Sequence, residues 1–259
     1  SNITVSNNQF LNLAAGNDAS LNLQRAIRVT SHSGAATTVT YNNNTINGAN
    51  IGMQWLAASN FSGNQPVAVT NNFLNGNMTG ILIQSNGSAN LYRNTINGGS
   101  IGLDIQSGFT SSVEENFIKD NTVDNIRVAA AAGVMGAINK NDLSGAGVFA
   151  INNLSTQTLN ATCNWYGTNS APAVAAKING PVNYIPYLTN GTDADADPSN
   201  GFQPLDPCAP CNLTVTSTSG TNAPCPGSAD STATVKVTGG SGTYAYLGAD
   251  GHTTNPATS

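Results

Sequence analysis

The chain has 259 residues and a net charge of -5, with only 8% of its residues charged and 6% aromatic. Its polarity therefore comes mainly from Asn, Ser and Thr. The 8 Lys and Arg residues are scattered along the chain, so no basic surface is predicted for nucleic acid or an anionic membrane. The longest apolar runs, such as Val128 to Met135, are shorter than the roughly 20 residues that span a membrane, and we expect no membrane insertion.

A repeat with one asparagine per copy runs through most of the chain. The anchor asparagines are spaced 36, 28, 22, 22, 25 and 23 residues apart: Asn8, Asn44, Asn72, Asn94, Asn116, Asn141 and Asn164. The residues three before and two after each anchor are all apolar. Alternation with a period of two predicts strands, and the many Asn, Gly, Ser and Thr residues disfavour a helix.

Three short strands per copy predict an all-β fold, a right-handed parallel β-helix solenoid of about six to seven rungs. Rungs in such a fold stack at roughly 4.8 Å, and only stacked copies bury a continuous core. Asparagine tolerates left-handed backbone in turns and can bond its own kind in the next rung. We therefore expect a structural ladder formed by Asn44, Asn72, Asn94, Asn116, Asn141 and Asn164.

The repeat also sets the domain boundaries. Residues 1–188 are predicted to form the β-helix, with a long first connection over 16–36 and a C-terminal cap over 163–188, where Trp165 and Tyr166 would plug the core. An acidic, proline-containing linker is expected over 189–210. Alternating apolar residues and the Gly239-Gly240 turn signal predict a partial β-sandwich-like module over 211–259. Because the chain begins inside a repeat, we expect a fragment or a processed product of a longer protein.

Three stretches carry resemblances to known families. The rungs resemble the pectate-lyase-like right-handed β-helix repeats, and "CNWYGTNSAP" with "GPVNYIPYL" looks like the closing motif of secreted bacterial proteins of that kind. The segment "TATVKVTGGSGTYAYLGADG" is similar to the SprB-type repeat of Bacteroidota surface proteins, including gliding adhesins, although Leu247 stands where a tryptophan is usual. The likeness implies a secreted, cell-surface protein, but β-helix repeats serve lyases, hydrolases and adhesins alike.

Most charged residues of the rungs fall into columns. Arg93, Glu115 and Lys140 each precede an anchor and alternate in sign on successive rungs, and Asp104 and Arg127 share a second outward column. We interpret both sets as exposed cross-rung ion pairs, each worth about 0.2–1 kcal/mol. Asp120 and Asp124, expected near Lys119 and Arg127, are the weak catalytic candidates. Because no neighbouring rung adds a second carboxylate to their columns, we do not expect an enzyme.

Two further groups raise the question of metals and disulfides. Asp193, Asp195 and Asp197 offer carboxylates at every second position, as calcium loops do, although an acidic solvated linker is the alternative and no cofactor is otherwise required. The single CxxC pair has no histidine nearby, which disfavours zinc. Disulfides suit a secreted chain, and of the three possible pairings we favour Cys211 with Cys225 and Cys163 with Cys208.

Three function classes remain after these exclusions. The first is an extracellular structural or adhesive rod, part of a larger multidomain adhesin, whose partners would be surface glycans or further copies of the same protein. The second is a polysaccharide-binding or polysaccharide-degrading β-helix protein. The third is an ice-binding solenoid, which would need a regular threonine ladder. The outward column two residues before the anchors is too irregular for that ladder.

Overall fold

The computed structural model describes residues 3–11, 25–29, 39–55, 67–84, 89–107, 112–133, 136–206, 208, 214–221, 232–238 and 257–258. The chain divides into two compact units, Ser1–Cys208 and Ala209–Ser259. Among the described residues, no helix is both long enough and apolar enough to cross a membrane.

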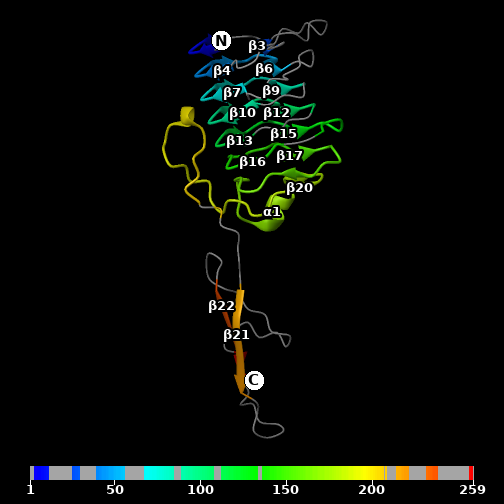
Figure 1. Ribbon diagram of the computed structural model, residues 1–259, viewed down its shortest axis with the longest axis vertical. Helices are drawn as coiled ribbons and strands as arrows, with labels where there is room; N and C mark the ends of the chain where they lie inside the picture. Colours follow the sequence, from blue (N-terminus) through cyan, green and yellow to red (C-terminus); the bar gives the residue numbers. More distant parts are fainter. Residues whose placement is uncertain are drawn as a thin grey trace. The chain divides into compact units, whose positions relative to one another are not determined.

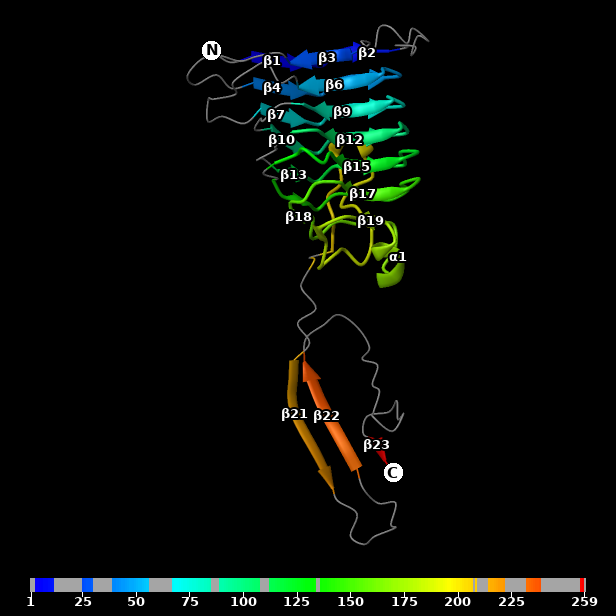
Figure 2. The same ribbon diagram turned by 90° about the vertical axis from the view of Figure 1, so that its right-hand side faces the viewer.

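The first unit is a parallel β-solenoid with three sheets, whose strands stack rung upon rung (Figures 1 and 2). Sheet A contains β1 (Ile3–Ser6), β4 (Val39–Asn42), β7 (Val67–Thr70), β10 (Ala89–Tyr92), β13 (Val113–Glu114) and β16 (Ile138–Asn139). Sheet B contains β2 (Gln9–Phe10), β5 (Thr45–Asn47), β8 (Phe73–Asn75), β11 (Thr95–Asn97) and β14 (Phe117–Lys119). Sheet C contains β3 (Arg25–Val29), β6 (Ile51–Trp55), β9 (Thr79–Ile83), β12 (Ile101–Ile105), β15 (Asp124–Val128), β17 (Phe149–Asn153) and β19 (Ile178–Asn179).

The predicted all-β parallel β-helix is confirmed. Five turns contribute a strand to all three sheets, since sheet B has 5 described strands, and less regular turns continue through single bridges at Asp142 and Trp165. One strand was missed by the sequence reasoning. Part of the predicted first connection is not a loop, because β3 pairs in parallel with β6. The spacing of 36 residues after the first anchor conceals that strand.

The apolar columns of the repeat form one continuous core. Each of the following residues is at most 5% exposed: Tyr41, Val69, Leu91, Val113 and Ile138 in sheet A; Ile46, Leu74, Ile96, Ile118 and Leu143 along sheet B; and Met53, Ile81, Leu103, Ile126 and Ile151 in sheet C. Burial of each large side chain contributes about 1.5–3 kcal/mol. The core is therefore distributed evenly along the rungs rather than concentrated in one layer.

The solenoid closes with an irregular end. It contains α1 (Ala171–Ala175), β18 (Leu159–Asn160) and β20 (Val182–Asn183). Val174 of α1 is fully buried against the core, and Tyr166 is 3% exposed, with its hydroxyl donating to the carbonyl oxygen of Ala161 at 3.0 Å. Burial raises the pKa of the Tyr166 phenol. Trp165, expected to plug the core beside Tyr166, packs instead with a separate cluster that contains Phe202.

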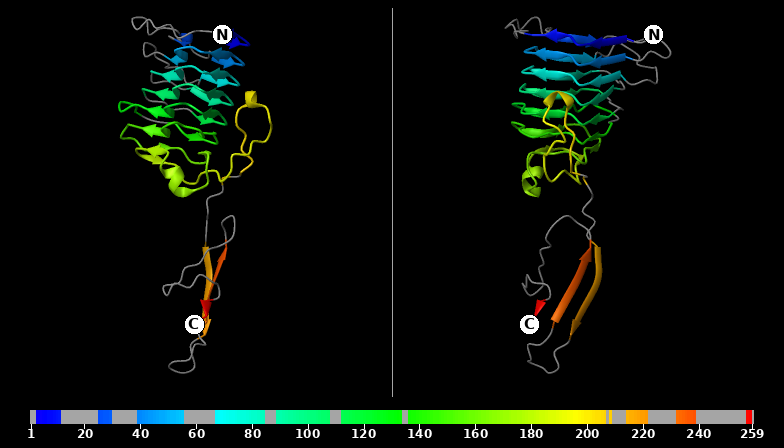
Figure 3. Two further views of the ribbon diagram at one scale, coloured as in Figure 1. Left: turned by 180° about the vertical axis from the view of Figure 1, so that it is seen from behind. Right: turned by 90° about the vertical axis from the view of Figure 1, so that its left-hand side faces the viewer.

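The predicted linker belongs to the first compact unit up to Cys208, and part of it, around Phe202, packs against the solenoid. We name residues 189–206 the strap; it forms a narrow loop beside the rungs, with η1 (Pro198–Asn200) at its tip (Figures 1 and 3). Phe202 is fully buried, and its ring centroid lies 5.6 Å from that of Phe117. The amide of Phe202 donates to the carbonyl oxygen of Glu115 at 2.9 Å. The composition of this acidic, proline-containing segment predicts a linker, but the buried Phe202, its backbone bond to Glu115 and the bond from Thr95 to Pro198 attach the segment to the rungs.

The second unit contains β21 (Thr214–Thr221), β22 (Thr232–Thr238) and β23 (Ala257–Thr258), which form an antiparallel sheet with β22 in the centre. A register shift lies between Val215 and Ser217. Every residue of β21 is exposed. The Gly239-Gly240 turn predicted from the sequence lies outside the described residues.

Candidate functional site

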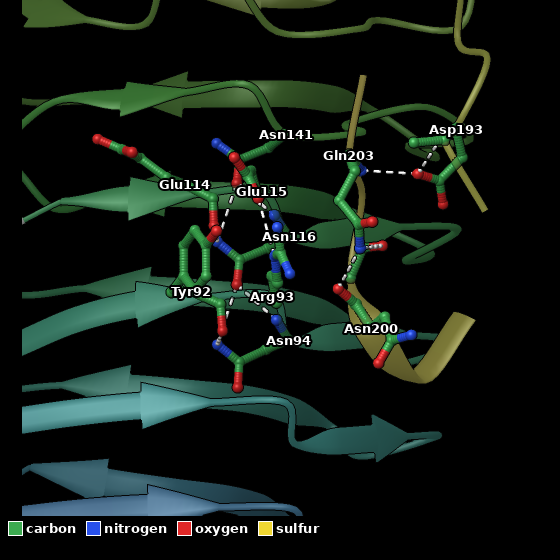
Figure 4. Close-up of polar contacts among 12 residues, drawn as sticks. Tyr92, Arg93, Asn94, Glu114, Glu115, Asn116, Asn141, Asp193, Asn200 and Gln203 are labelled. Carbon is green, nitrogen blue, oxygen red and sulfur yellow. Dashed lines mark hydrogen bonds and ion pairs between the residues drawn. The ribbon is translucent and has the colours of Figure 1, made fainter. Parts of the chain in front are cut away.

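The anchor asparagines form a hydrogen-bonded ladder inside one turn of every rung. Asn116 accepts bonds at Oδ1 from the backbone amide and Nδ2 of Asn94, at 2.8 and 2.9 Å. Its own Nδ2 donates to Asn141 Oδ1 at 2.9 Å (Figure 4). The same Nδ2 also donates to the carbonyl oxygen of Leu91 at 2.9 Å. The same amide-to-amide bond, 2.9–3.0 Å long, joins successive members of the whole series: Asn8, Asn44, Asn72, Asn94, Asn116, Asn141 and Asn164.

The left-handed backbone of this turn lies one residue before each anchor, not at the anchor as we expected. The φ angles there are between 53° and 60°, at Asn7, Asn43, Asn71, Arg93, Glu115, Lys140 and Cys163. The reversal of the chain at this residue leaves the anchor in a conformation that directs its amide along the stack. A left-handed conformation costs about 1–2 kcal/mol for most residues other than glycine and asparagine, so the charged members of the column carry a backbone penalty.

Two of the three charged residues in that column form an ion pair. Arg93 Nε lies 2.9 Å from Glu115 Oε2, and the side chains are 37% and 18% exposed. The hydrogen bond to Glu115 is the main cause that raises the pKa of Arg93. The guanidinium also stacks over the Tyr92 ring at 4.9 Å (Figure 4). Lys140, the third member, is exposed and forms no ion pair with any described residue.

A partly buried polar network, centred on Asp104, lies on the outer side of sheet C. Asp104 Oδ2 lies 2.7 Å from Arg127 Nη2 and also accepts from Gln106 Nε2 at 3.0 Å. Because Asp104 is only 2% exposed, its expected exposure was wrong: a side chain that points away from the core can still be covered. The hydrogen bond to Asp104 is the main cause that raises the pKa of Arg127. Gln84 Nε2 continues the network by donating to Gln106 Oε1 at 2.9 Å.

Asp124 lies on the same side of sheet C and is 1% exposed. Its Oδ2 accepts from Asn152 Nδ2 at 2.9 Å, and Asn179 bonds Asn152 in turn. Its Oδ1 is buried without a hydrogen-bond partner, and its charge acts on the nearby Arg127. An unpaired buried carboxylate oxygen is unusual, so Asp124 is the described carboxylate with the most unusual surroundings.

The structure does not bring the two weak catalytic candidates into one site. Asp120 is exposed, with a φ of 56°, and occupies a turn column that holds positive-φ glycines in other rungs, including Gly98 and Gly145. Lys119, expected beside these aspartates, pairs instead with Asp142 at 3.4 Å. Asp120 therefore shapes a turn, whereas Asp124 belongs to the buried network of sheet C.

The carboxylates predicted as calcium ligands do not converge. Asp193 Oδ1 accepts the backbone amides of Gln203 and Ala194 at 2.7 and 2.9 Å. Asp195 and Asp197 bond amides two residues ahead in the chain. Within the described part of the chain, no group of three or more His, Cys, Asp or Glu side chains could hold a metal ion. These aspartates therefore shape the turns of the strap.

The predicted disulfide between Cys163 and Cys208 is confirmed, with Cα atoms 5.5 Å apart. The bridge joins the last described left-handed turn of the ladder to Cys208, two residues beyond the strap. The other predicted pair, Cys211 with Cys225, lies outside the described residues.

A second, partial asparagine network was missed by the sequence reasoning. Asn77 accepts the amide of Ala49 at 2.9 Å and donates to Ile46. Asn121 donates to Asn125 Oδ1 at 2.9 Å. Both asparagines are 1% exposed. The available signal was their position five residues after the anchors Asn72 and Asn116, but the same column holds Ala49, Gly99 and Ala146 in other rungs, which conceals the pattern.

The outer surface of the solenoid thus combines cross-rung pairs, a buried carboxylate network and a docked strap. Comparison of the chain with protein-family models, with curated proteins and with solved structures gives no match.

Proposed function

We propose that the chain is an extracellular cell-surface protein, a rigid β-helix rod that belongs to a larger multidomain adhesin. The observation that carries the proposal is the uninterrupted asparagine ladder, which couples each rung to the next by buried amide bonds of 2.9–3.0 Å. Fully satisfied buried networks rigidify a structure. A rod of this kind holds terminal modules at a fixed spacing, and its partners would be surface glycans or further copies of the protein.

The use of charge in the rungs supports the same proposal. Three ion pairs connect adjacent rungs: Arg93–Glu115, Lys119–Asp142 and Arg127–Asp104. These charged side chains bind one another across adjacent rungs, and they do not gather into one catalytic or binding site. The disulfide supports an oxidising, extracellular location, because such bonds persist outside the reducing cytosol. The resemblance of the C-terminal module to SprB-type repeats supports attachment to a surface adhesin.

A second candidate function is polysaccharide binding or degradation on sheet C. The observation that favours it is the unpaired Oδ1 of Asp124 near Arg127, because a carboxylate beside a guanidinium can act in general acid-base chemistry. Asp104 and Asp124 are at most 2% exposed, so a polymer could reach them only if this face opened. Because these carboxylates are buried, we rank polysaccharide binding or degradation below the structural rod.

A paired binding and turnover assay tests the two functions. The whole chain would be applied to a glycan array and incubated with acidic and neutral polysaccharides, with and without calcium. The rod proposal expects no turnover, and binding without turnover identifies an adhesin ligand. Turnover abolished by Asp124→Asn, but retained in the matched variant Asp120→Asn at an exposed turn, would replace the rod by an enzyme.

Hydrogen exchange provides the matching test of rigidity. Amides of the strands that flank the ladder should exchange slowly in the regular rungs from β4 to β13, because each of these strands is paired on both sides. Fast exchange in a central rung such as that of β7 would contradict a rigid rod. This measurement does not depend on any ligand.

A further inference from the structure

The disulfide closes a covalent loop over the whole C-terminal end of the solenoid. Cys163 and Cys208 are 45 residues apart in the sequence. The enclosed segment contains α1, β19, β20 and the strap. The second unit begins at Ala209, directly after Cys208. Any tension that enters the solenoid through the second unit therefore reaches the bridge before it reaches the enclosed segment.

The strap would be a weak point if it carried that tension. Its two arms are joined by few backbone bonds, including Ala194 N to Gln203 O at 2.9 Å and Leu205 N to Thr192 O at 3.2 Å. Its attachments to the rungs are local: the buried ring of Phe202, the bond from the Phe202 amide to the carbonyl oxygen of Glu115 at 2.9 Å, and a bond from Thr95 Oγ1 to the carbonyl oxygen of Pro198. A pull on the Cys208 end would load these contacts one at a time and peel the strap from the rungs.

The disulfide transfers the tension to Cys163, which lies in a turn that is hydrogen-bonded to the adjacent rung. Cys163 precedes Asn164, the last described member of the ladder, and its carbonyl oxygen accepts the amide of Lys140 in the adjacent rung at 2.8 Å. Asn164 is held by Asn141 Nδ2 at 3.0 Å and donates to the carbonyl oxygen of Ile138 at 2.8 Å. Force applied at Cys163 therefore acts on a rung that is bonded across its turn.

We infer that the Cys163–Cys208 disulfide is a mechanical bypass, which takes the cap and the strap out of the load path between the second unit and the rungs. This inference rests on the proposed function as a surface rod, because only a tethered protein carries tension. The strap can then stay docked on sheet B while the protein is pulled.

Single-molecule pulling on the whole chain, held by its two ends, tests the bypass. The double variant Cys163→Ser with Cys208→Ser should show an added early step at low force. That step should extend the chain by about 150 Å, since about 45 residues reach at most about 3.3–3.6 Å each. The wild type should lack the step. The second unit contributes the same events to both proteins and serves as an internal reference.

A cavity variant in the strap makes the test independent of how well the serine variant folds. Phe202→Ala weakens strap docking without touching the disulfide. With the disulfide intact, Phe202→Ala should leave the first rupture force of the rungs unchanged, and in the cysteine-free background it should lower the force of the early step. A lower first rupture force with the bridge intact, or an early 150 Å step in the wild type, would overturn the bypass. Polysaccharide turnover would defeat the rod function while leaving these force results as they stand.

Discussion

Two ion pairs of the solenoid have the same chemistry and different surroundings. Arg93–Glu115 lies at the ladder turn, with side chains 37% and 18% exposed, whereas Arg127–Asp104 lies on sheet C, with a carboxylate only 3% exposed. Both join adjacent rungs, and both point away from the core. The difference shows that the direction of a side chain on a rung does not set its burial. Asp104 is enclosed by its partners Gln106 and Arg127, on its own rung and on the adjacent one. Burial of this kind determines what the loss of a contact costs.

The ladder asparagines are the fully buried extreme of this comparison. Asn116→Ala removes the side-chain bonds to Asn94, Asn141 and Leu91 and leaves the backbone amide of Asn94 buried without its acceptor. Asn94 Nδ2 keeps its bond to Val69, and Asn141 Oδ1 keeps the backbone amide of residue 116. Each lost hydrogen bond contributes about 0.5–1.5 kcal/mol, and an unsatisfied buried group costs about 1–3 kcal/mol, so together these losses should lower the free energy of unfolding by about 3 kcal/mol or more in urea denaturation. Asn139→Ala, a half-exposed asparagine on the outer side of β16, should change it by less than about 0.5 kcal/mol. Similar losses at both sites would contradict a structural ladder.

The two ion pairs directly test whether burial of the carboxylate determines the stability lost when a pair is broken. Asp104→Ala leaves Arg127 and Gln106 without their acceptor in a covered site, so it should lower the free energy of unfolding by about 2–4 kcal/mol. Glu115→Ala should lower it by less than about 1 kcal/mol, because exposed pairs contribute little. Both variants can be measured in the same denaturant series at low and moderate salt. Equal losses in the free energy of unfolding would mean that the burial of Asp104 does not increase the contribution of its ion pair to stability.

Substitutions in the left-handed column before the anchors can distinguish the energetic effect of a charged side chain from that of backbone strain. Lys140 has a φ of 55° and forms no ion pair with any described residue, whereas Asn43 and Asn71 hold the same position in earlier rungs. Lys140→Asn should therefore raise the free energy of unfolding by about 0.5–1 kcal/mol, because asparagine tolerates this conformation better than lysine. Lys140→Ala is the control, since alanine keeps the strain and should bring no gain. A gain from alanine as large as that from asparagine would assign the effect to the lysine side chain.

The periodic part of the fold could be predicted from the sequence, because each rung repeats the same requirement. The anchor asparagines and the columns of Ile96 and Ile118 follow from spacing alone. The strap could not be predicted, since Phe202 stands in a segment with no period and its burial depends on Phe117, far away in the sequence. The burial of Asp104 was missed because an outward position in the repeat does not by itself imply exposure. The left-handed position had a signal in Asn7, Asn43 and Asn71, but Arg93, Glu115 and Lys140 concealed it.

The smallest expected change in stability concerns the strap, where a partly buried carboxylate, Asp193, can be compared with an exposed one. Burial is the main cause that raises the pKa of Asp193, and the charges of Asp195 and Asp142 add to it. The folded form therefore binds a proton more readily than the unfolded form, and the ionised carboxylate destabilises the fold near neutral pH. Stability from this group rises as the pH falls through the folded-state pKa. Asp193→Asn keeps an oxygen for the amides of Gln203 and Ala194, so it should raise the melting temperature at about pH 7 and match the wild type at about pH 3.

Asp197 supplies the matched control with the opposite sign. Its carboxylate is exposed, and hydrogen bonds from the hydroxyl and amide of Ser199 lower its pKa. The ionised form is therefore favoured in the folded protein, and its contribution is present at neutral pH and lost on acidification. Asp197→Asn should lower the melting temperature slightly at about pH 7 and have no effect at about pH 3. If both variants shifted the melting temperature in the same direction, a general change of net charge would explain the pH dependence better than the burial of Asp193 in the strap.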